Sequence, residues 1–334
     1  METFVSAWAN GKNLPPKYVF PEGKRPGKNC VVPPLKNIPV IDLGKVDSDD
    51  YHTKIVQQIL EAAQNFGVFQ VINHGVPTSL ISDTRDVVKE FSDLPAEERS
   101  KFYSRDLSKK FMIFTSSLQY EKEAYHYWRD VIKHFCTTPM NVSLQQWPTN
   151  PLRYREVVGD YIANQRILGS RLLNLIAEGL GLEQGYFAKG LCEEGNLSVN
   201  HYPACPDPTL TLGAGEHYDP GLMTILHQDD VEGLQVLYDG NWGLIEPVPN
   251  AFVIIVGSLL QVVSNGKLKS AKHKVVTNAT RDRTTLGFFN EPTKECIVGP
   301  AKALVTSENP PIYEPVQFRD LLKAVVAAFS SEKN

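Results

Sequence analysis

The sequence lacks any apolar run long enough to cross a membrane. No stretch of its 334 residues approaches the roughly 18–20 consecutive apolar residues that a bilayer-spanning helix needs. The first residues show neither the basic segment followed by an apolar one that marks a secretory signal, nor the arginine-rich character of a transit peptide. We therefore expect a cytoplasmic protein with no membrane partner.

Cysteine and excess charge are also scarce. The chain has an odd number of cysteines, and no two are spaced as C-x-x-C, which argues against a disulfide framework and against a zinc site. The five, expected to be reduced and packed, are Cys30, Cys136, Cys192, Cys205 and Cys296. A formal net charge of −4 gives no reason to expect a nucleic-acid partner. What remains is an ordinary globular protein, which we expect to be a monomer that binds a small molecule.

Helices dominate the predicted first half. Residues 1–37 are rich in proline, glycine and lysine, and this composition predicts an extended arm without repeated structure. Short strands are predicted at residues 38–43 and 68–73. Apolar residues with helical spacing predict helices over residues 51–66 and 77–94.

Strands dominate the predicted second half. Residues 104–150 show no clear pattern, and residues 152–182 carry the longest helical one. After Asn196, short β-type runs alternate with turn residues, which predicts a sandwich or a barrel in an α+β fold. The runs are residues 197–202, 222–228, 234–238, 252–256, 275–277 and 286–289. We divide the chain into an N-terminal helical and strand region, residues 1–150, and a second region, residues 151–334, that holds the long helix, the β core and a C-terminal helix.

The segment around His217 indicates a metal site. Residues two apart on a strand point to the same side, so His217 and Asp219 are expected to project together. His273 lies ahead of another β-type run and is the best candidate for a third ligand. Two histidines and one carboxylate leave adjacent coordination positions open, as in non-haem iron(II) oxygenases. The other histidines fit surface, turn or core positions, and His227 is the nearest rival.

A second group of residues suits a carboxylate ligand. If the segment after His273 is a strand, Arg283 and Thr285 share a face. The guanidinium fork matches a carboxylate with two parallel hydrogen bonds, and the distal carboxylate of 2-oxoglutarate is such a partner. Asn200 and Tyr202 are also two apart and can face the same pocket. The alternative for Arg283 is a surface ion pair with an acidic neighbour.

Together these residues resemble the plant iron(II)/2-oxoglutarate-dependent dioxygenases of specialised metabolism. The resemblance covers most of the chain. Its motifs are IPVIDL at 38–43, GVFQVINHGV at 67–76, YWRD at 127–130, NHYPACP at 200–206, HYD at 217–219, GLQV at 233–236 and SNG at 264–266. Within the family the chain is most similar to hyoscyamine 6-dioxygenase-like enzymes, with flavonoid and salicylate hydroxylases next.

The resemblance implies a double-stranded β-helix, or jelly-roll, core with an N-terminal helical region. It also implies that His217, Asp219 and His273 hold iron(II), that 2-oxoglutarate and O₂ are co-substrates, and that ascorbate supports the reaction as a reductant. Oxidative decarboxylation of 2-oxoglutarate to succinate and CO₂ would be coupled to hydroxylation of a prime substrate. The chain departs from the usual family pattern at HKVV (273–276), RTT (283–285) and GS (257–258), and in a shorter carboxyl terminus, and no departure touches a metal ligand.

Three alternatives stay open at this point. A catalytically silent cupin-like binding protein would keep the β core and lose a ligand or Arg283. An iron-dependent halogenase needs a small residue in the place of Asp219. An oxidase on the same fold would work without 2-oxoglutarate, and co-substrate dependence distinguishes it.

The expected prime substrate is a mid-sized, ring-containing plant metabolite, with an alkaloid favoured on resemblance and a phenolic next. The aromatic-rich residues 111–128, together with the predicted helix at residues 318–329, are expected to cover the pocket mouth. A protonated amine in a dry pocket needs a carboxylate partner. Residues 114–118 offer none, so Glu121 or Glu123 would have to turn inward.

Overall fold

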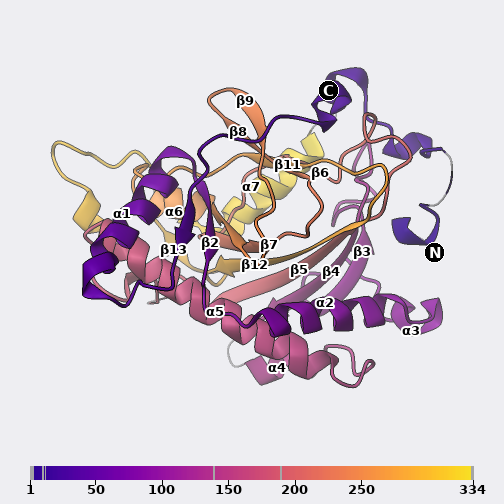
Figure 1. The fold of residues 1–334 in the computed structure, drawn as a ribbon, viewed down its shortest axis with the longest axis horizontal. Helices are drawn as coiled ribbons and strands as arrows, with labels where there is room; N and C mark the ends of the chain where they lie inside the picture. Colours follow the sequence, from indigo (N-terminus) through magenta and orange to yellow (C-terminus); the bar gives the residue numbers. More distant parts are fainter. Residues whose placement is uncertain (1–3, 10, 12, 138–139, 189, 332–334) are drawn as a thin grey trace.

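Two β-sheets lie at the centre of the fold (Figure 1). Side chains from both sheets line one cavity. The structure is a computed structural model that describes residues 4–9, 11, 13–137, 140–188 and 190–331. The larger sheet has the strand order β1-β2-β10-β7-β12-β5-β4-β3, and the smaller has the order β6-β11-β8-β9. This pair of sheets is the predicted jelly-roll core, and the expectation of an α+β fold is confirmed.

The strands of the larger sheet are β1 (Val40–Asp42), β2 (Val68–Ile72), β3 (Phe111–Thr115), β4 (Asp130–Cys136), β5 (Glu194–Tyr202), β7 (Met223–His227), β10 (Phe252–Val256) and β12 (Arg283–Glu291). Those of the smaller sheet are β6 (Ala214–His217), β8 (Leu234–Tyr238), β9 (Asn241–Leu244) and β11 (His273–Val275). A separate pair is formed by β13 (Ile297–Val298) and β14 (Val316–Gln317).

The strand β12 shows how side chains are sorted between the two faces of the larger sheet. Leu286 and Phe288 point into the hydrophobic core beneath the helices. Arg283, Thr285 and Phe289 alternate with them and line the central cavity. Because successive strand residues point to opposite faces, the same strand supplies both the core and the site.

Helices cover the outer face of the larger sheet. The long ones are α1 (Asp49–Asn65), α2 (Thr78–Ser92) and α5 (Tyr154–Gly179), and in Figure 1 α2 and α5 run along the lower side of the sheet. Their apolar faces share one core with the outward side chains of the strands, which explains the helical spacing in the sequence. The short ones are α3 (Ala96–Ser100), α4 (Met140–Leu144) and α6 (Ser258–Val263), and α7 (Phe318–Ser331) closes the chain.

The N-terminal arm packs over the β4 side of the molecule through short 3₁₀ turns. The turns are Val5–Ala7, Pro16–Tyr18, Glu22–Lys24 and Gly27–Cys30. Trp8 and Tyr18 contact the fully buried Trp128 edge to face, with ring centroids 5.3 and 5.6 Å apart. The carboxylate of Asp130 accepts the backbone N–H groups of Val5 and Ser6 at 2.8 and 2.9 Å. The arm is therefore fastened to the strand that borders the cavity.

The sequence misjudged where strands occur in the first half. Residues 104–150, which showed no pattern, form β3, β4 and α4, and β1 to β4 all belong to the larger sheet. The sheet thus combines strands from residues 1–150 and 151–334, and the division there stays a prediction. Across the described residues, no helix has both the length and the apolar character that a membrane crossing requires.

Candidate metal centre and active site

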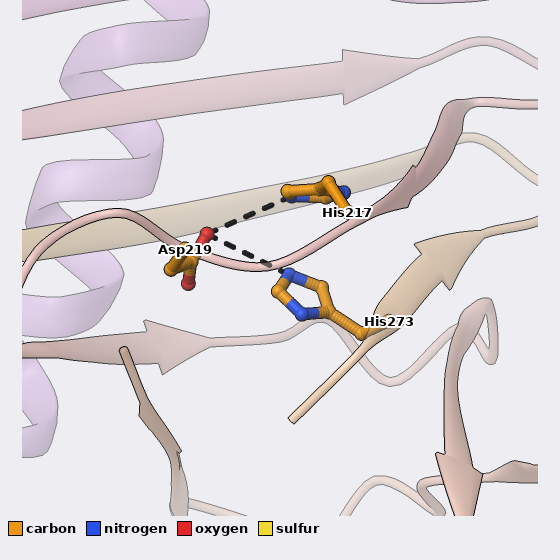
Figure 2. Close-up of side chains that lie close together, drawn as sticks. All are labelled: His217, Asp219 and His273. Carbon is orange, nitrogen blue, oxygen red and sulfur yellow. Dashed lines mark ion pairs between the residues drawn. The ribbon is translucent and has the colours of Figure 1, made fainter. Parts of the chain in front are cut away.

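Three side chains that the sequence singled out converge on one point (Figure 2). Nε2 of His217 lies 3.6 Å, and Nε2 of His273 3.7 Å, from Oδ1 of Asp219. Each residue offers one ligand atom, and these three atoms all lie within 4.8 Å of one another. His217 and His273 are cross-strand partners in the β6–β11 pair, with ring centroids 4.1 Å apart. This spacing suits one metal ion held by all three.

Backbone and side-chain partners orient the three groups. Nδ1 of His217 faces the carbonyl of Gly215 at 2.8 Å, and Nδ1 of His273 faces that of Ala271 at 3.0 Å. With the proton on Nδ1, each ring presents its Nε2 lone pair to the metal. The Thr224 hydroxyl donates to Oδ2 of Asp219 at 2.5 Å, which leaves Oδ1 for the metal.

The electrostatics of the centre favour a neutral imidazole at His217. Burial, reinforced by the neighbouring His273, lowers the pKa of His217 to about 4. Its Nε2 lone pair is therefore available at neutral pH. The donor set of two histidines and one carboxylate fits iron(II) and would leave coordination positions open.

The prediction that His217 and Asp219 lie on one face of a strand was wrong. The strand β6 ends at His217, so Asp219 lies in the following loop and not on a strand face. The loop is held by Ser258, whose N–H donates to the Asp219 carbonyl at 2.8 Å. The rival His227 faces away from the cavity, with its ring 5.8 Å from that of Phe252.

Arg283 lies at the other end of the cavity and is almost completely buried. Its Nε donates to the carbonyl of Val231 at 3.0 Å, and Nη2 reaches Oε1 of Gln228 at 3.4 Å. Nη1 has no hydrogen-bond partner in the described part of the structure. A buried guanidinium nitrogen without an acceptor costs free energy, so an anionic ligand fits here.

The register of β5 and β12 brings the remaining predicted residues to Arg283. Arg283 pairs with Tyr202, and Thr285 with Asn200, in the β5–β12 ladder. All four line the same cavity. The guanidinium carbon of Arg283 lies 5.5 Å from the centroid of the Tyr202 ring, and Oδ1 of Asn200 accepts from Arg129 at 3.4 Å. Threonine keeps a hydroxyl where serine is usual, so a carboxylate at Nη1 would find a second donor in Thr285.

The expected aromatic cover is only partly present. Phe114 and Tyr127 line the cavity, which has a volume of about 260 Å³. Phe111 and Trp128 do not; Phe111 packs under the helices and Trp128 against the N-terminal arm. The side chains of α7 from residue 318 to 324 do not line the cavity either. The rest of the predicted cover, including Phe329, lies outside the described side chains. A larger cavity of about 460 Å³ lies between α2 and the outer face of the sheet, away from the triad.

The cations that line the cavity were not anticipated. Glu123 does turn inward, but its carboxylate accepts hydrogen bonds from Ser116 and Ser117 and pairs with His126. Two cations, Arg129 and Lys133, line the cavity instead. The signal in the sequence that could have indicated this was Lys133, which follows apolar residues at 131–132.

Two departures from the usual family pattern leave the triad in place. Lys274 points away from the cavity, with its ammonium 3.9 Å from the Trp242 ring centroid and 3.9 Å from a carboxylate oxygen of Glu216. The neighbour of Ser258, Gly257, is required because a Cβ there would lie 2.1 Å from the Gly221 carbonyl oxygen. Neither change disturbs the triad.

Two family models match parts of the chain. Residues 193–292 match the family described as the 2OG-Fe(II) oxygenase superfamily, and residues 38–151 match the non-haem dioxygenase in morphine synthesis N-terminal family. Hyoscyamine 6-dioxygenase of Hyoscyamus niger is 40% identical over 96% of this chain and 93% of its own. Flavanone 3-dioxygenase 2 of Oryza sativa subsp. japonica is 42% identical over 93% of this chain and 89% of its own.

A similar fold occurs among solved structures. The crystal structure of JOX2 in complex with 2OG, Fe, and JA superposes with a TM-score of 0.83 and 32% identity. The match covers 97% of this chain and 94% of JOX2. The sequence relatives and this structural neighbour each match nearly the whole length of the chain.

Proposed function

This chain belongs to the 2-oxoglutarate- and iron(II)-dependent oxygenase superfamily, and from that premise we propose that it hydroxylates a mid-sized, ring-containing plant metabolite. One observation carries the proposal. A triad suited to iron and an arginine with an unpartnered buried nitrogen lie in one cavity with an aromatic wall. His217, Asp219 and His273 are proposed as the metal ligands, and Arg283, Thr285, Tyr202 and Asn200 as the 2-oxoglutarate site.

Each part of the cavity has a separate task in this reaction. When bound, iron(II) with 2-oxoglutarate and O₂ supplies the oxidising chemistry, with succinate and CO₂ as co-products. The triad holds the metal at the cavity wall, and Thr224 keeps one Asp219 oxygen occupied so that the other binds. Arg283 orients the co-substrate through its distal carboxylate. Phe114 and Tyr127 exclude water and present an apolar surface on which a ring can stack.

The cavity charges bear on the class of substrate. The earlier preference for an alkaloid rested on resemblance and required a free acidic group. Glu123 is already engaged by its neighbours, whereas Arg129 and Lys133 line the cavity. These groups support a phenolic or other uncharged or acidic ring compound over a protonated amine. Asp219 stands where a halogenase would need a small residue, which supports oxygenation.

The experiment is a panel of tropane, benzylisoquinoline, flavonoid, coumarin and salicylate compounds, incubated with the enzyme, Fe(II), ascorbate and 2-oxoglutarate. Mass spectrometry is used to follow the gain of one oxygen, and succinate release is quantified in parallel. We expect oxygenation of at least one ring compound with matching succinate. Oxygenation of only aliphatic acids or amino acids would contradict the proposal, and product formation without 2-oxoglutarate would indicate the oxidase alternative.

We also propose that the enzyme acts in the cytoplasm as a monomer. All five cysteines are free, which is typical of proteins kept in a reducing compartment. Light scattering coupled to size-exclusion chromatography measures the assembly state directly, and a mass of twice 37.3 kDa would contradict the monomer.

A further inference from the structure

Lys133 extends from a mostly buried strand into the cavity. On β4, Ile132 and His134 turn toward the helix side of the sheet, and Lys133 between them lines the cavity. Its ammonium lies 5.3 Å from the ring centroid of Phe135 and 5.8 Å from that of Phe289. A cation is therefore placed beside aromatic rings at the cavity wall.

The ammonium has no direct protein counter-ion. Within the described residues, no carboxylate oxygen lies within 4.0 Å of it, and it makes no hydrogen bond to the protein. Glu291 acts on it only from a greater distance. Burial raises the pKa of Glu291 to about 7. A partly buried charge without a direct counter-ion is unfavourable, and a bound anion would relieve it.

The other cation in this wall is already engaged. Nε of Arg129 donates to the carbonyl of Ser116 at 2.8 Å, and Nη1 reaches Oδ1 of Asn200 at 3.4 Å. Lys133 therefore differs from Arg129 in having its charge directed at the cavity contents and not at protein acceptors.

Sheet register separates Lys133 from the 2-oxoglutarate end. Lys133 pairs with Ser198, which pairs with Gly287, while Arg283 is four residues earlier on β12. At about 3.3 Å per residue, the two rows lie roughly 13 Å apart along the strands. One cation thus serves the co-substrate end, and the other lies beyond its reach.

The same register leaves room beside Lys133. Ser198 and Gly287 carry the smallest side chains of this row, and both line the cavity. The strand β4 is three strands from β7, which carries the Thr224 that holds Asp219. At about 4.8 Å per strand this is roughly 14 Å, a span that a lysine side chain and one ring system can cover.

We propose that Lys133 binds a carboxylate of the prime substrate, so that the enzyme acts on a ring-bearing carboxylic acid in its anionic form. The acid group lies against the ammonium between Phe135 and Phe289, and the ring extends over Ser198 and Gly287 toward the metal. The carbon to be hydroxylated is then the part of the molecule farthest from the acid group. This inference rests on the proposed function and specifies its substrate class.

The test compares ring-bearing acids with their uncharged amides. Salicylate, 4-coumarate and 1-naphthylacetate are each titrated, beside the matching primary amide, into the enzyme loaded with Fe(II) and 2-oxoglutarate under nitrogen, and binding is measured by calorimetry. We expect at least one acid to bind on the order of 10- to 100-fold more tightly than its amide, as a charge-assisted contact requires. Equal affinities in every pair, or no binding of any acid, would overturn the proposal.

Variants locate the preference. Lys133→Met should remove the difference between acid and amide, and Lys133→Arg should retain most of it. Lys54→Met, on the exposed side of α1, is the matched control and should keep the wild-type preference. The dissociation constant for 2-oxoglutarate, measured in each variant, reports whether the site is folded; Lys133→Gln replaces the methionine variant if that one does not fold. An acid preference that survives in a folded, neutral variant would overturn the role of Lys133.

Succinate release in the absence of any prime substrate separates the two proposals. If the wild-type enzyme turns over 2-oxoglutarate but does not prefer acids, only the Lys133 inference fails. If it neither binds nor turns over 2-oxoglutarate, the proposed function fails with it.

Discussion

The imidazoles of His217 and His273 are each fixed by a backbone carbonyl that faces Nδ1. This contact selects the tautomer, so that the metal-facing nitrogen needs no rearrangement on binding. The short Thr224 contact does the same for Asp219. At the scale of single residues, the centre is therefore preformed by its nearest neighbours.

Replacing any one ligand should abolish turnover. His217→Ala, Asp219→Ala and His273→Ala each remove one of three donors, and within the described residues no other histidine or carboxylate joins this cluster. Iron content, measured by mass spectrometry of the metal, and succinate release should both fall to background. His227→Ala is the matched control, since this histidine lies outside the cavity, and it should keep wild-type iron content. Near wild-type turnover in a ligand variant would remove that residue from the centre.

Arg283→Leu should raise the Michaelis constant for 2-oxoglutarate far more than it lowers iron content. Loss of a charge-assisted, two-point contact costs roughly 2–4 kcal/mol, on the order of 30- to 1000-fold. Thr285→Val and Tyr202→Phe should show smaller effects of the same kind. Arg281→Leu, an exposed neighbour that pairs with Asp230 at 2.7 Å, is the control and should leave the constant unchanged. A constant that is equally unchanged in Arg283→Leu would place the carboxylate elsewhere.

At the scale of elements, the metal loop depends on a close backbone approach. The segment from Asp219 to Gly221 is held against the start of α6 by backbone contacts, including Gly257 N to Leu222 O at 2.9 Å. A Cβ at Gly257 would meet the Gly221 carbonyl oxygen at 2.1 Å. There is therefore no room for a side chain at Gly257, where the loop that carries Asp219 packs against it.

Gly257→Ala should displace the loop and weaken metal binding. We expect a loss of about 1–3 kcal/mol in the free energy of unfolding, as overpacking usually causes, and an iron affinity reduced at least about tenfold because Asp219 shifts. Chemical denaturation and metal titration measure the two. Gly159→Ala in α5 is the control, since a Cβ there meets only Leu144 at 3.5 Å, and it should raise stability slightly. Unchanged iron affinity in Gly257→Ala would show that the loop tolerates the shift.

Elements with a clean pattern were predictable from the sequence, and those without one were not. The helix at residues 51–66 and the strands β8 and β10 were predicted within two residues of their ends, because one face is apolar or the run is bounded by turn residues. The strand β3 is buried on both faces, so it shows no alternation and was missed. Which strands pair cannot be read from such patterns.

The site was more predictable than the fold around it. Its seven proposed residues come in pairs spaced two apart, with His273 alone, and all seven line one cavity. This spacing can be recognised in the sequence without knowing which strands pair. Lys133 was missed because a single lysine in a strand ordinarily indicates a solvent-facing side, and only the position of β4 beside β5 reveals that its face borders the cavity.

At the scale of the whole molecule, buried histidines couple stability to pH. His134 is completely buried between β4 and α5, with Nε2 2.9 Å from the Tyr154 hydroxyl, and burial lowers its pKa to about 3. In the unfolded chain the value returns to about 6.5. Between these two values the unfolded state binds a proton that the folded state does not, so stability falls as pH decreases from 6.5 toward 3.

Between pH 6.5 and 4.5, the free energy of unfolding of the metal-free enzyme should therefore fall by about 2 kcal/mol more than that of a His134→Gln variant. Urea unfolding at several pH values measures the difference. His52 has the opposite effect on stability. Its hydrogen bond to Glu178 raises its pKa, so its contribution to the free energy of unfolding is lost as pH rises. Identical pH dependence in wild type and His134→Gln would contradict the assignment.

The larger sheet combines strands from early and late parts of the chain, which has a consequence for folding during synthesis. The strand β2 ends at Ile72, but its antiparallel partner β10 begins only at Phe252. At roughly 5–20 residues per second, a ribosome needs on the order of 10–40 s to deliver the partner. During that interval the unpaired edge of β2 is a template for unwanted pairing between nascent chains. We expect a fragment of residues 1–150 expressed alone to aggregate, as measured by sedimentation. The full chain should stay in solution, because β10 covers the edge of β2 once it has emerged.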